Sequence, residues 1–220
     1  MIEVERLEKS YGFARALKGI SFSVSKGEVV GFLGPNGAGK STTMKILTGY
    51  LAPSSGGGTV NGHHVVRESL RVRECVGYLP ESTPLYGEMR VDDYLAFVAE
   101  IRGVTTRDRR AKVARAVDLC GLRLVTGKNI VELSKGYKQR VGLAQAIVHE
   151  PPVLILDEPT SGLDGTSTLE ILQILRTLAN NGGKTIILTI HQPRIEAYKL
   201  VDNLILLVNG GRLVFYGPAY

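Results

Sequence analysis

Apolar and polar residues alternate one by one near the start of the chain, which is typical of strands with one buried face. This pattern covers residues 2–8 and 20–24, with Tyr11 and Gly12 in the turn between them. A loop is expected over residues 53–58, which are rich in Ser and Gly, followed by a short strand and turn at 59–62. Two last strands, 204–208 and 213–215, are joined by Asn209-Gly210, a dipeptide that favours a tight hairpin.

A second pattern consists of short, continuous apolar runs, which predict strands buried on both faces. Such runs cover residues 29–33, 153–156 and 184–190, and a further strand is expected at 75–79, where Pro80 ends it. The run at 153–156 has the composition of a central strand in a parallel sheet.

Between these strands the apolar residues change to a helical period. Val91, Tyr94, Leu95, Val98 and Ile101 share one face of an amphipathic helix. Similar patterns predict helices around 113–120, 141–148 and 169–178. We therefore expect one α/β domain over residues 1–220, with an all-helical insertion from about 85 to 150.

The strand at 29–33 leads directly into a glycine-rich loop and then a helical pattern. The loop fits G-x-x-x-x-G-K-[ST], a phosphate-binding motif, and consists of Gly34, Pro35, Asn36, Gly37, Ala38, Gly39, Lys40, Ser41 and Thr42. A loop between a strand and a helix N-terminus directs backbone N–H groups and the helix dipole at an anion. We expect Lys40 to reach the β- and γ-phosphates of a nucleoside triphosphate and the Ser41 hydroxyl to ligate Mg²⁺.

Two carboxylates, Asp157 and Glu158, follow the buried strand at 153–156. Parallel strands deliver their C-terminal ends to one edge of a sheet, so this pair is expected beside the phosphate-binding loop. Asp157 is suited to hold Mg²⁺, and Glu158 to orient or deprotonate the attacking water. A turn capped by two carboxylates before Pro159 would explain the dipeptide alone, but not its pairing with the loop upstream.

Composition sets further limits. The chain has 220 residues, 44% of them hydrophobic, which is enough for one sizeable core. No apolar run approaches the roughly 20 residues of a membrane-spanning helix, and residues 1–5 do not resemble a secretory leader. The two cysteines suggest no disulfide framework or metal site, so a reducing cytosol is expected.

The net charge of +6 is unevenly placed, because residues 102–140 hold eleven Lys and Arg against three Asp and Glu. Such a block could contact nucleic acid or anionic lipid. Helices with solvated basic faces are the favoured explanation, because the aromatic residues that accompany nucleic-acid binding are missing. No nucleic-acid partner is expected.

The segment Leu133-Ser134-Lys135-Gly136-Tyr137-Lys138-Gln139-Arg140 lies about twenty residues before the Asp157-Glu158 strand. In that position it resembles the signature loop of the ATP-binding-cassette (ABC) ATPases, and the resemblance covers essentially the whole chain. It implies a P-loop NTPase core of mostly parallel sheet with flanking helices, an N-terminal antiparallel β subdomain and an inserted α-helical subdomain. ATP and Mg²⁺ are the implied cofactors.

The resemblance also assigns roles to single residues. Tyr11 matches an aromatic residue that stacks on adenine, and His191 a switch histidine that senses the γ-phosphate. Residues 159–164 match a loop that communicates between paired subunits. In this family two domains pair head to tail, so Ser134 and Gly136 would donate to the γ-phosphate held by a partner, either a second copy or a paralogue.

Three positions depart from the commonest family pattern. Glu81 stands where a Gln usually contacts Mg²⁺ and water, Lys135 replaces a Gly, and Tyr137 replaces a Gln. A negative charge at Glu81 could tighten Mg²⁺ binding or slow hydrolysis. Lys135 is expected to point to solvent. These departures leave the ATP-binding prediction intact and bear on the hydrolysis rate.

Local motifs suggest finer relationships. Residues 79–91 and the signature loop resemble bacterial ATPases associated with gliding motility, whereas residues 189–193 and 214–218 are similar to G-subfamily exporters. Both resemblances imply export, with the domain on the cytoplasmic face beside an integral membrane permease. The surface around residues 83–89 is expected to contact that permease. Whether the chain is a whole subunit or one domain of a longer transporter stays open.

Two other functions are weighed against the transporter. A soluble single-cassette ABC ATPase, such as an assembly factor without a permease, is the main alternative. A GTPase or small-molecule kinase is disfavoured, because no Asn-Lys-x-Asp guanine-reading motif is found and the signature loop would have no role.

Overall fold

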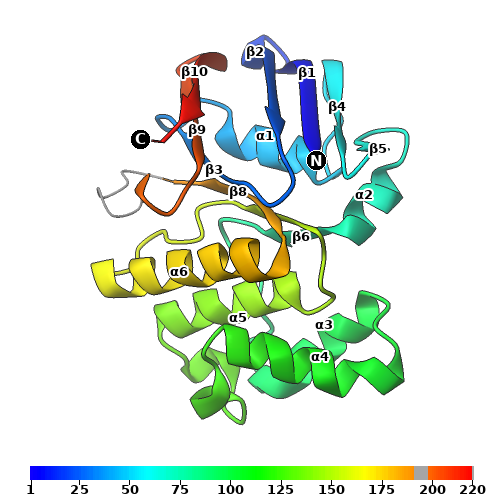
Figure 1. Cartoon of the computed structure of the whole chain (residues 1–220), viewed down its shortest axis with the longest axis vertical. Coiled ribbons are helices and arrows are strands. Elements are labelled where there is room, and N and C mark those ends of the chain that lie inside the picture. Colours follow the sequence, from blue (N-terminus) through cyan, green and yellow to red (C-terminus); the bar gives the residue numbers. More distant parts are fainter. Residues whose placement is uncertain (191–197, 220) are drawn as a thin grey trace.

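The computed structural model describes residues 1–190 and 198–219. Its elements form layers: an antiparallel sheet with helix α1 beneath it, a larger sheet across the middle, and a stack of helices on the other side (Figure 1). The α/β class expected from the sequence is confirmed. Within these residues no helix combines the length and apolarity that a membrane span needs.

The larger sheet has the strand order β10-β9-β3-β8-β7-β6. Pairing is parallel from β9 through β6, and only β10 runs antiparallel, on its neighbour β9. The strands are β3 (Val29–Leu33), β6 (Val76–Leu79), β7 (Val153–Leu156), β8 (Thr185–Thr189), β9 (Asn203–Val208) and β10 (Arg212–Pro218). The predicted neighbourhood of the phosphate-binding loop and Asp157 follows from this order, because β3 and β7 flank β8 and end at the same edge.

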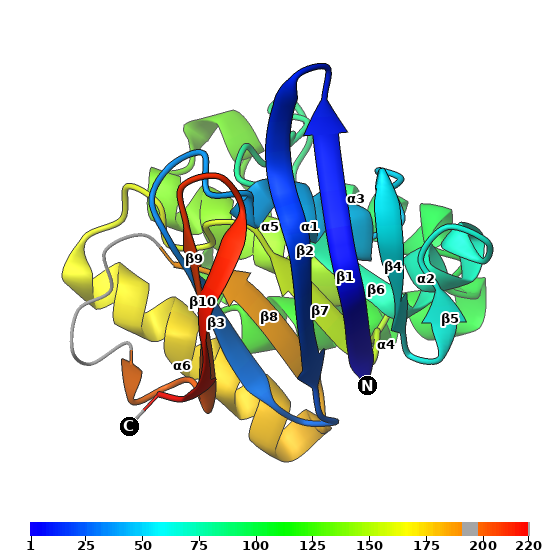
Figure 2. The same cartoon turned by 90° about the horizontal axis from the view of Figure 1, so that it is seen from above.

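The second sheet is antiparallel, with the order β2-β1-β4-β5, and crosses above the first (Figure 2). Its strands are β1 (Ile2–Tyr11), β2 (Ala14–Val24), β4 (Ser55–Val60) and β5 (His63–His64). The expected loop at 53–58 is wrong over most of its length, since β4 begins at Ser55. Its glycines permit close backbone pairing, because a Cβ on Gly56 or Gly58 would collide with a carbonyl oxygen of β1.

Six α-helices accompany the sheets in the described chain: α1 (Lys40–Leu47), α2 (Ser69–Cys75), α3 (Val91–Ile101), α4 (Thr106–Leu119), α5 (Lys135–Ile147) and α6 (Gly165–Gly182). Two short 3-10 turns, Arg123–Val125 and Ile130–Glu132, lie between α4 and α5. The four predicted amphipathic helices are present, and α2 was not anticipated. Helices α3, α4 and α5 all come between β6 and β7.

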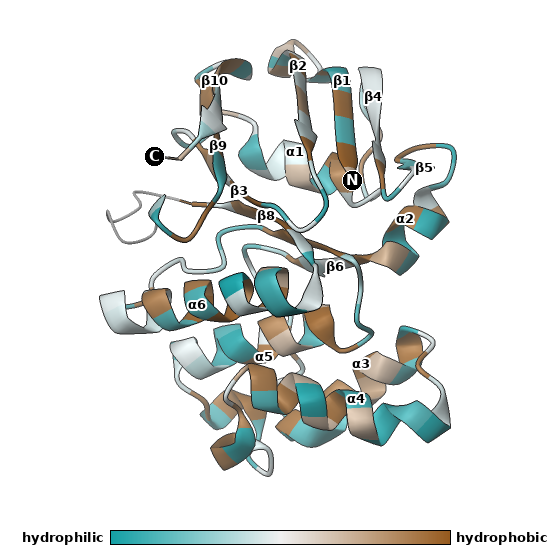
Figure 3. Ribbon diagram, in the orientation of Figure 1, coloured by the Kyte–Doolittle hydropathy of each residue, from teal (hydrophilic) through white to brown (hydrophobic). Residues whose placement is uncertain are grey.

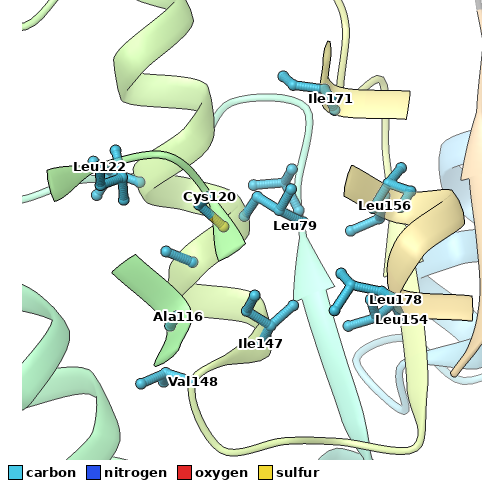
Figure 4. Close-up of a cluster of buried hydrophobic side chains, with 14 of the residues drawn as sticks. Leu79, Ala116, Cys120, Leu122, Ile147, Val148, Leu154, Leu156, Ile171 and Leu178 are labelled. Atoms are coloured by element: carbon cyan, nitrogen blue, oxygen red, sulfur yellow. The ribbon is translucent and has the colours of Figure 1, made fainter. Parts of the chain in front are cut away.

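The central sheet separates two hydrophobic cores. Alternate residues of β7 enter different cores: Val153 and Ile155 face α1 and the antiparallel sheet, while Leu154 and Leu156 face the stacked helices. Figure 4 shows Leu154 and Leu156 beside Leu178 of α6. The central strands are correspondingly the most hydrophobic part of the fold, and α4 carries many hydrophilic residues (Figure 3).

The basic block at 102–140 is partly paired with carboxylates within the fold. Five of its eleven cations pair with carboxylates: Arg109 with Glu100, Lys112 and Arg115 with Glu150, Arg123 with Asp118, and Arg140 with Glu170. These ion pairs agree with the solvated helical faces that the sequence favoured.

Candidate functional site

The phosphate-binding loop connects β3 to α1 and owes its shape to three glycines. Gly34, Gly37 and Gly39 all have positive φ, at 148°, 79° and 95°. A Cβ on Gly34 would collide with the Leu207 carbonyl oxygen, and one on Gly39 would lie 2.6 Å from the Ala16 carbonyl oxygen. Only glycine combines these φ values with such close packing.

Helix α1 begins without a side-chain cap. Its N-cap is Gly39, in a left-handed conformation, and the first intrahelical bond runs from Thr43 N to Gly39 O at 2.9 Å. The amide N–H groups of residues 40–42 therefore have no partner inside the helix. This is the backbone arrangement that binds phosphate at helix N-termini.

Lys40 lies inside the loop and is only 6% exposed. Its Nζ donates to the carbonyl oxygens of Gly34 (2.7 Å) and Pro35 (3.1 Å). It forms no ion pair with a carboxylate in residues 1–190 or 198–219. A buried ammonium group whose partners are neutral carbonyls favours a bound anion, because an uncompensated buried charge is costly.

A cavity of about 390 Å³ opens in front of the loop. Both Glu81 and Glu158 reach this cavity from the ends of β6 and β7. Its lining consists of Ala16, Asn36, Gly37, Gly39, Lys40, Ser41, Thr42, Glu81 and Glu158. The structure thus brings the loop and two of the predicted acidic residues together at one site.

Asp157 anchors a hydrogen-bond network behind this cavity. Its Oδ1 accepts from Ser41 Oγ at 3.2 Å and from Thr189 Oγ1 at 2.9 Å, and its side chain is buried. Its backbone N donates to Leu79 O at 2.8 Å. The bond from Ser41 therefore holds the Asp157 side chain against α1, and the bond from Thr189 holds it against β8.

Thr189 is a site residue that the sequence analysis missed. Besides donating to Asp157, its Oγ1 accepts from the backbone N of Glu158 at 2.6 Å. One buried hydroxyl therefore orients both acidic residues. No motif marks this threonine, and its position at the end of the buried run 184–190 was the only available signal.

Glu158 adopts a left-handed backbone conformation with φ of 50°, which is uncommon for a residue with a side chain. The bond from its N–H to Thr189 holds this conformation. Strained backbone of this kind persists where surrounding contacts enforce it and is concentrated at functional sites. Here it directs the half-buried Glu158 toward the cavity, away from buried Asp157.

The side chains around the cavity fit a magnesium ion. Mg²⁺ prefers oxygen ligands and uses one or two carboxylates. The Ser41 hydroxyl and Asp157 carboxylate are already adjacent, and the Glu81 carboxylate lines the same cavity. The negative charge of Asp157 also acts on Tyr78. Burial of the Tyr78 side chain is the main cause that raises its pKa to about 12, and the charge of Asp157 is the next largest cause.

Six predicted ATP-binding residues do not line this cavity: Gly34, Pro35 and Ala38 of the loop itself, and Tyr11, Ser134 and Gly136. Tyr11 is half exposed at the end of β1, with Lys9 Nζ 5.3 Å from its ring centre. Ser134 and Gly136 lie at the N-terminus of α5, where Ser134 Oγ accepts from Tyr137 N at 3.4 Å. His191, predicted to sense the γ-phosphate, falls outside the described residues.

The departures at Lys135 and Tyr137 have local partners. Lys135 does not simply point to solvent: its Nζ lies against Gly162, where an added Cβ would collide with it. Lys135 thus links the start of α5 to the loop before α6. The Tyr137 ring packs against the Arg140 guanidinium, 5.8 Å from its centre.

Comparisons with known proteins agree on the family. Residues 17–161 match the ABC transporter family. The chain is 34% identical over 217 residues to the linearmycin resistance ATP-binding protein LnrL of Bacillus subtilis (strain 168), covering 99% of this chain and 69% of that protein. It is 37% identical over 217 residues to the Nod factor export ATP-binding protein I of Burkholderia orbicola (strain AU 1054), covering 99% and 71%.

A solved structure extends this similarity to the fold. The structure of cbiO1 from Clostridium perfringens, described as part of the ABC transporter complex cbiONQ, matches with a TM-score of 0.89 and 33% identity. The match covers 99% of this chain and 88% of cbiO1.

Proposed function

Because this chain belongs to the ABC transporter family, as an ATP-binding domain, we propose that it hydrolyses ATP in a head-to-tail dimer to drive export through a membrane permease. One observation carries the proposal. The cavity lined by Lys40 and Glu158, with Asp157 bonded to Ser41 behind it, does not include Ser134 or Gly136, which lie at the N-terminus of another helix. The chain therefore holds two separate half-sites, which a second chain would bring together.

Each residue at the cavity has a distinct task in this proposal. The amides of residues 40–42 and the Lys40 ammonium bind the phosphates, and Ser41 with Asp157 holds Mg²⁺, assisted by Glu81. The metal ion supplies charge stabilisation to the phosphate oxygens when it is bound. Glu158 accepts a proton from the attacking water. Tyr11 and His191 keep their predicted roles at the adenine and the γ-phosphate.

The partner chain would complete the site. Ser134 Oγ and Gly136 N–H would donate to the γ-phosphate bound by the other subunit, which is the second copy or a paralogue. Ser134 is exposed, and its hydroxyl makes only a long bond to its own helix. It therefore retains hydrogen-bonding capacity for a ligand.

The export direction rests on relatives, one of which is named for Nod factor export and another for linearmycin resistance. The expected permease contact at 83–89 has an exposed aromatic surface. Tyr86 is 59% exposed and lies 5.9 Å, between ring centres, from the partly exposed Phe97. This surface would place the domain on the cytoplasmic face of the membrane.

ATP hydrolysis at increasing protein concentration tests the dimer. We expect the rate per chain to rise with concentration and then reach a plateau, because each site needs a second chain. A rate per chain that is independent of concentration would contradict the proposal.

Charge reversal tests the permease contact. Glu88 is exposed and forms no ion pair with a described residue, so Glu88→Lys is not expected to disturb the fold. Substrate export by the assembled transporter should fall while ATP hydrolysis by the isolated chain stays unchanged. Arg90→Glu is less direct, because Arg90 pairs with Asp92 at 3.0 Å. Unchanged export in both variants would move the contact elsewhere.

A further inference from the structure

A second cavity, of about 360 Å³, is lined by residues that are distant in sequence from the phosphate-binding loop. Helix α4, the end of α5 and the last turns of α6 enclose it. Its lining consists of Lys112, Arg115, Ala116, Leu119, Ile147, Glu150, Thr177, Leu178, Asn181, Gly182 and Lys184. Glu150 and Lys184 precede β7 and β8, whereas Asp157 follows β7, so the two cavities lie at opposite edges of the parallel sheet. Its volume falls within the range of about 300–1,000 Å³ that is usual for small-molecule sites.

One rim of this cavity carries an excess of positive charge. Three cationic side chains surround a single carboxylate, Glu150, so the net charge of the rim is +2. Lys112 Nζ lies 3.2 Å from Glu150 Oε2, and Arg115 Nη1 lies 2.8 Å from Glu150 Oε1. The carboxylate of Glu150 is therefore already shared between two cations.

Lys184 is the rim cation that forms no ion pair with the Glu150 carboxylate. Its Nζ donates to the backbone carbonyl oxygen of Glu150 at 2.8 Å, a neutral partner. Glu150 has a positive φ of 58°, so this carbonyl is held by an uncommon backbone conformation. Burial lowers the pKa of Lys184, and nearby Arg115 and Lys112 add to that effect while Glu150 opposes it. An anion in the cavity would offset this cost.

The opposite wall of the cavity is apolar. Ala116 from α4, Ile147 from α5 and Leu178 from α6 are all buried side chains, and Figure 4 shows them in the core where the three helices meet. Leu119, partly buried, extends this wall along α4. The cavity therefore presents apolar atoms opposite its charged rim.

We propose that this cavity binds a small amphipathic carboxylate, such as a medium-chain fatty acid. Its carboxylate contacts Lys184 and the Lys112 and Arg115 side chains at the rim, where charge-assisted hydrogen bonds are strongest. Its apolar body packs against Ala116, Ile147 and Leu178. The ligand then bridges α4, in the helical insertion, and α6, beside the sheet. This site is independent of the ATP-binding residues and of the proposed transport function.

Calorimetric titration of the whole chain with octanoate, in the absence of nucleotide, tests the proposal. We expect saturable binding with a Kd below about 1 mM, a reasonable affinity for a ligand of ten heavy atoms. Octanol keeps the alkyl tail of octanoate without its negative charge, and acetate keeps the carboxylate without the long alkyl tail. Both should bind at least about tenfold more weakly, and so should inorganic phosphate.

Two variants locate the site, each with a matched control. Lys184→Gln removes the cation that is not paired with Glu150 and should weaken octanoate binding about tenfold. Lys128→Gln, on an exposed turn, should leave octanoate binding unchanged. Thr177→Phe places a ring into the cavity from the exposed face of α6 and should also weaken octanoate binding. Asn180→Phe adds the same ring outside the cavity lining and is its control. Thermal unfolding checks that each variant is folded.

The proposal is overturned by any of three results: no saturable octanoate binding, equal binding by octanol or phosphate, or unchanged binding in both Lys184→Gln and Thr177→Phe. Because no nucleotide is present, none of these results bears on the ATPase.

Discussion

Two helix N-termini in this molecule are built in opposite ways. Helix α1 starts after a left-handed glycine with no side-chain cap, and its first residue, Lys40, is buried and lines the same cavity as Glu158. Helix α5 starts after Ser134, whose hydroxyl caps the helix itself, and its first residue, Lys135, is exposed. The first N-terminus is prepared for an anion by its own chain, whereas the second lies on the surface and does not line the cavity in front of the phosphate-binding loop. The difference supports the proposed division of the site between two chains.

The largest expected effect comes from removing the buried cation of α1. Lys40→Ala should weaken ATP binding by about 10²–10³-fold, because charge-assisted hydrogen bonds to the phosphates are lost. Lys45→Ala, on the exposed side of the same helix, is the control and should bind ATP as the wild type does. Titration with a fluorescent ATP analogue measures both. Equal affinities would remove α1 from the binding site.

The next change separates capping from function at α5. Ser134→Asp preserves an N-cap oxygen but places a negative charge where the partner's γ-phosphate would bind. It should abolish ATP-dependent dimerisation, as measured by light scattering, while leaving ATP binding to the monomer intact.

Ser134→Ala provides the companion measurement. Removing an N-cap costs about 0.5–2 kcal/mol of stability, and Thr105→Ala removes the corresponding cap of α4, where Thr105 Oγ1 accepts from Asp108 N at 3.3 Å. Both variants should lower the unfolding temperature, but only Ser134→Ala should also lower ATP hydrolysis. Equal hydrolysis in the two would reduce Ser134 to a structural cap.

A smaller effect is expected at Thr189, behind the cavity in front of the phosphate-binding loop. Thr189→Val removes the hydroxyl that joins Asp157 to the Glu158 backbone and should cost about 1–3 kcal/mol, because both partners lose a buried hydrogen bond. Thr185→Val, on the same strand, also removes a buried hydrogen-bonded hydroxyl, one that accepts from Gly27 N at 3.0 Å.

The two threonine variants should lose comparable stability in denaturant unfolding. Only Thr189→Val should also raise the Mg²⁺ concentration that half-saturates hydrolysis. A parallel rise in Thr185→Val would mean that the metal dependence reflects general destabilisation of β8.

The smallest effect is expected at Glu81. This side chain lines the cavity but is exposed, so solvent screens its charge. Glu81→Gln should change the half-saturating Mg²⁺ concentration by no more than about threefold, an energy difference typical of an exposed ionic interaction. Glu88→Gln, equally exposed but outside the cavity, is the control. A change of several tens of times would make Glu81 a principal metal ligand.

The sequence was sufficient for those parts of the site that depend on local pattern. The strand before Asp157 and the loop around Lys40 were predicted because a fully buried strand and a phosphate-binding loop each have a distinctive composition. The shared sheet edge then followed from the rules of parallel sheets. The helix that follows Gly39 was likewise predicted, whereas α5 was predicted only from about residue 141 and begins at Lys135.

The remaining features depend on contacts between distant segments. Thr189 lies 32 residues from Asp157, and nothing in its neighbourhood marks it as a partner of that carboxylate. The sequence pattern predicts a loop over 53–58, where most of β4 lies, because glycines disfavour strands in isolation, whereas close pairing with β1 requires them. The contact of Lys135 with Gly162 also needed the folded chain, since solvent was the simplest expectation for an exposed lysine.

The divided site is tested most directly by the mass of a Glu158→Gln variant with and without saturating MgATP, measured by light scattering. This substitution keeps the shape of the side chain and removes the proposed proton acceptor, so bound ATP should persist. We expect a monomer without nucleotide, a dimer with MgATP, and a monomer again when Ser134→Asp is added. A Glu158→Gln chain that binds ATP and stays monomeric would contradict the division of the site between α1 of one chain and α5 of another.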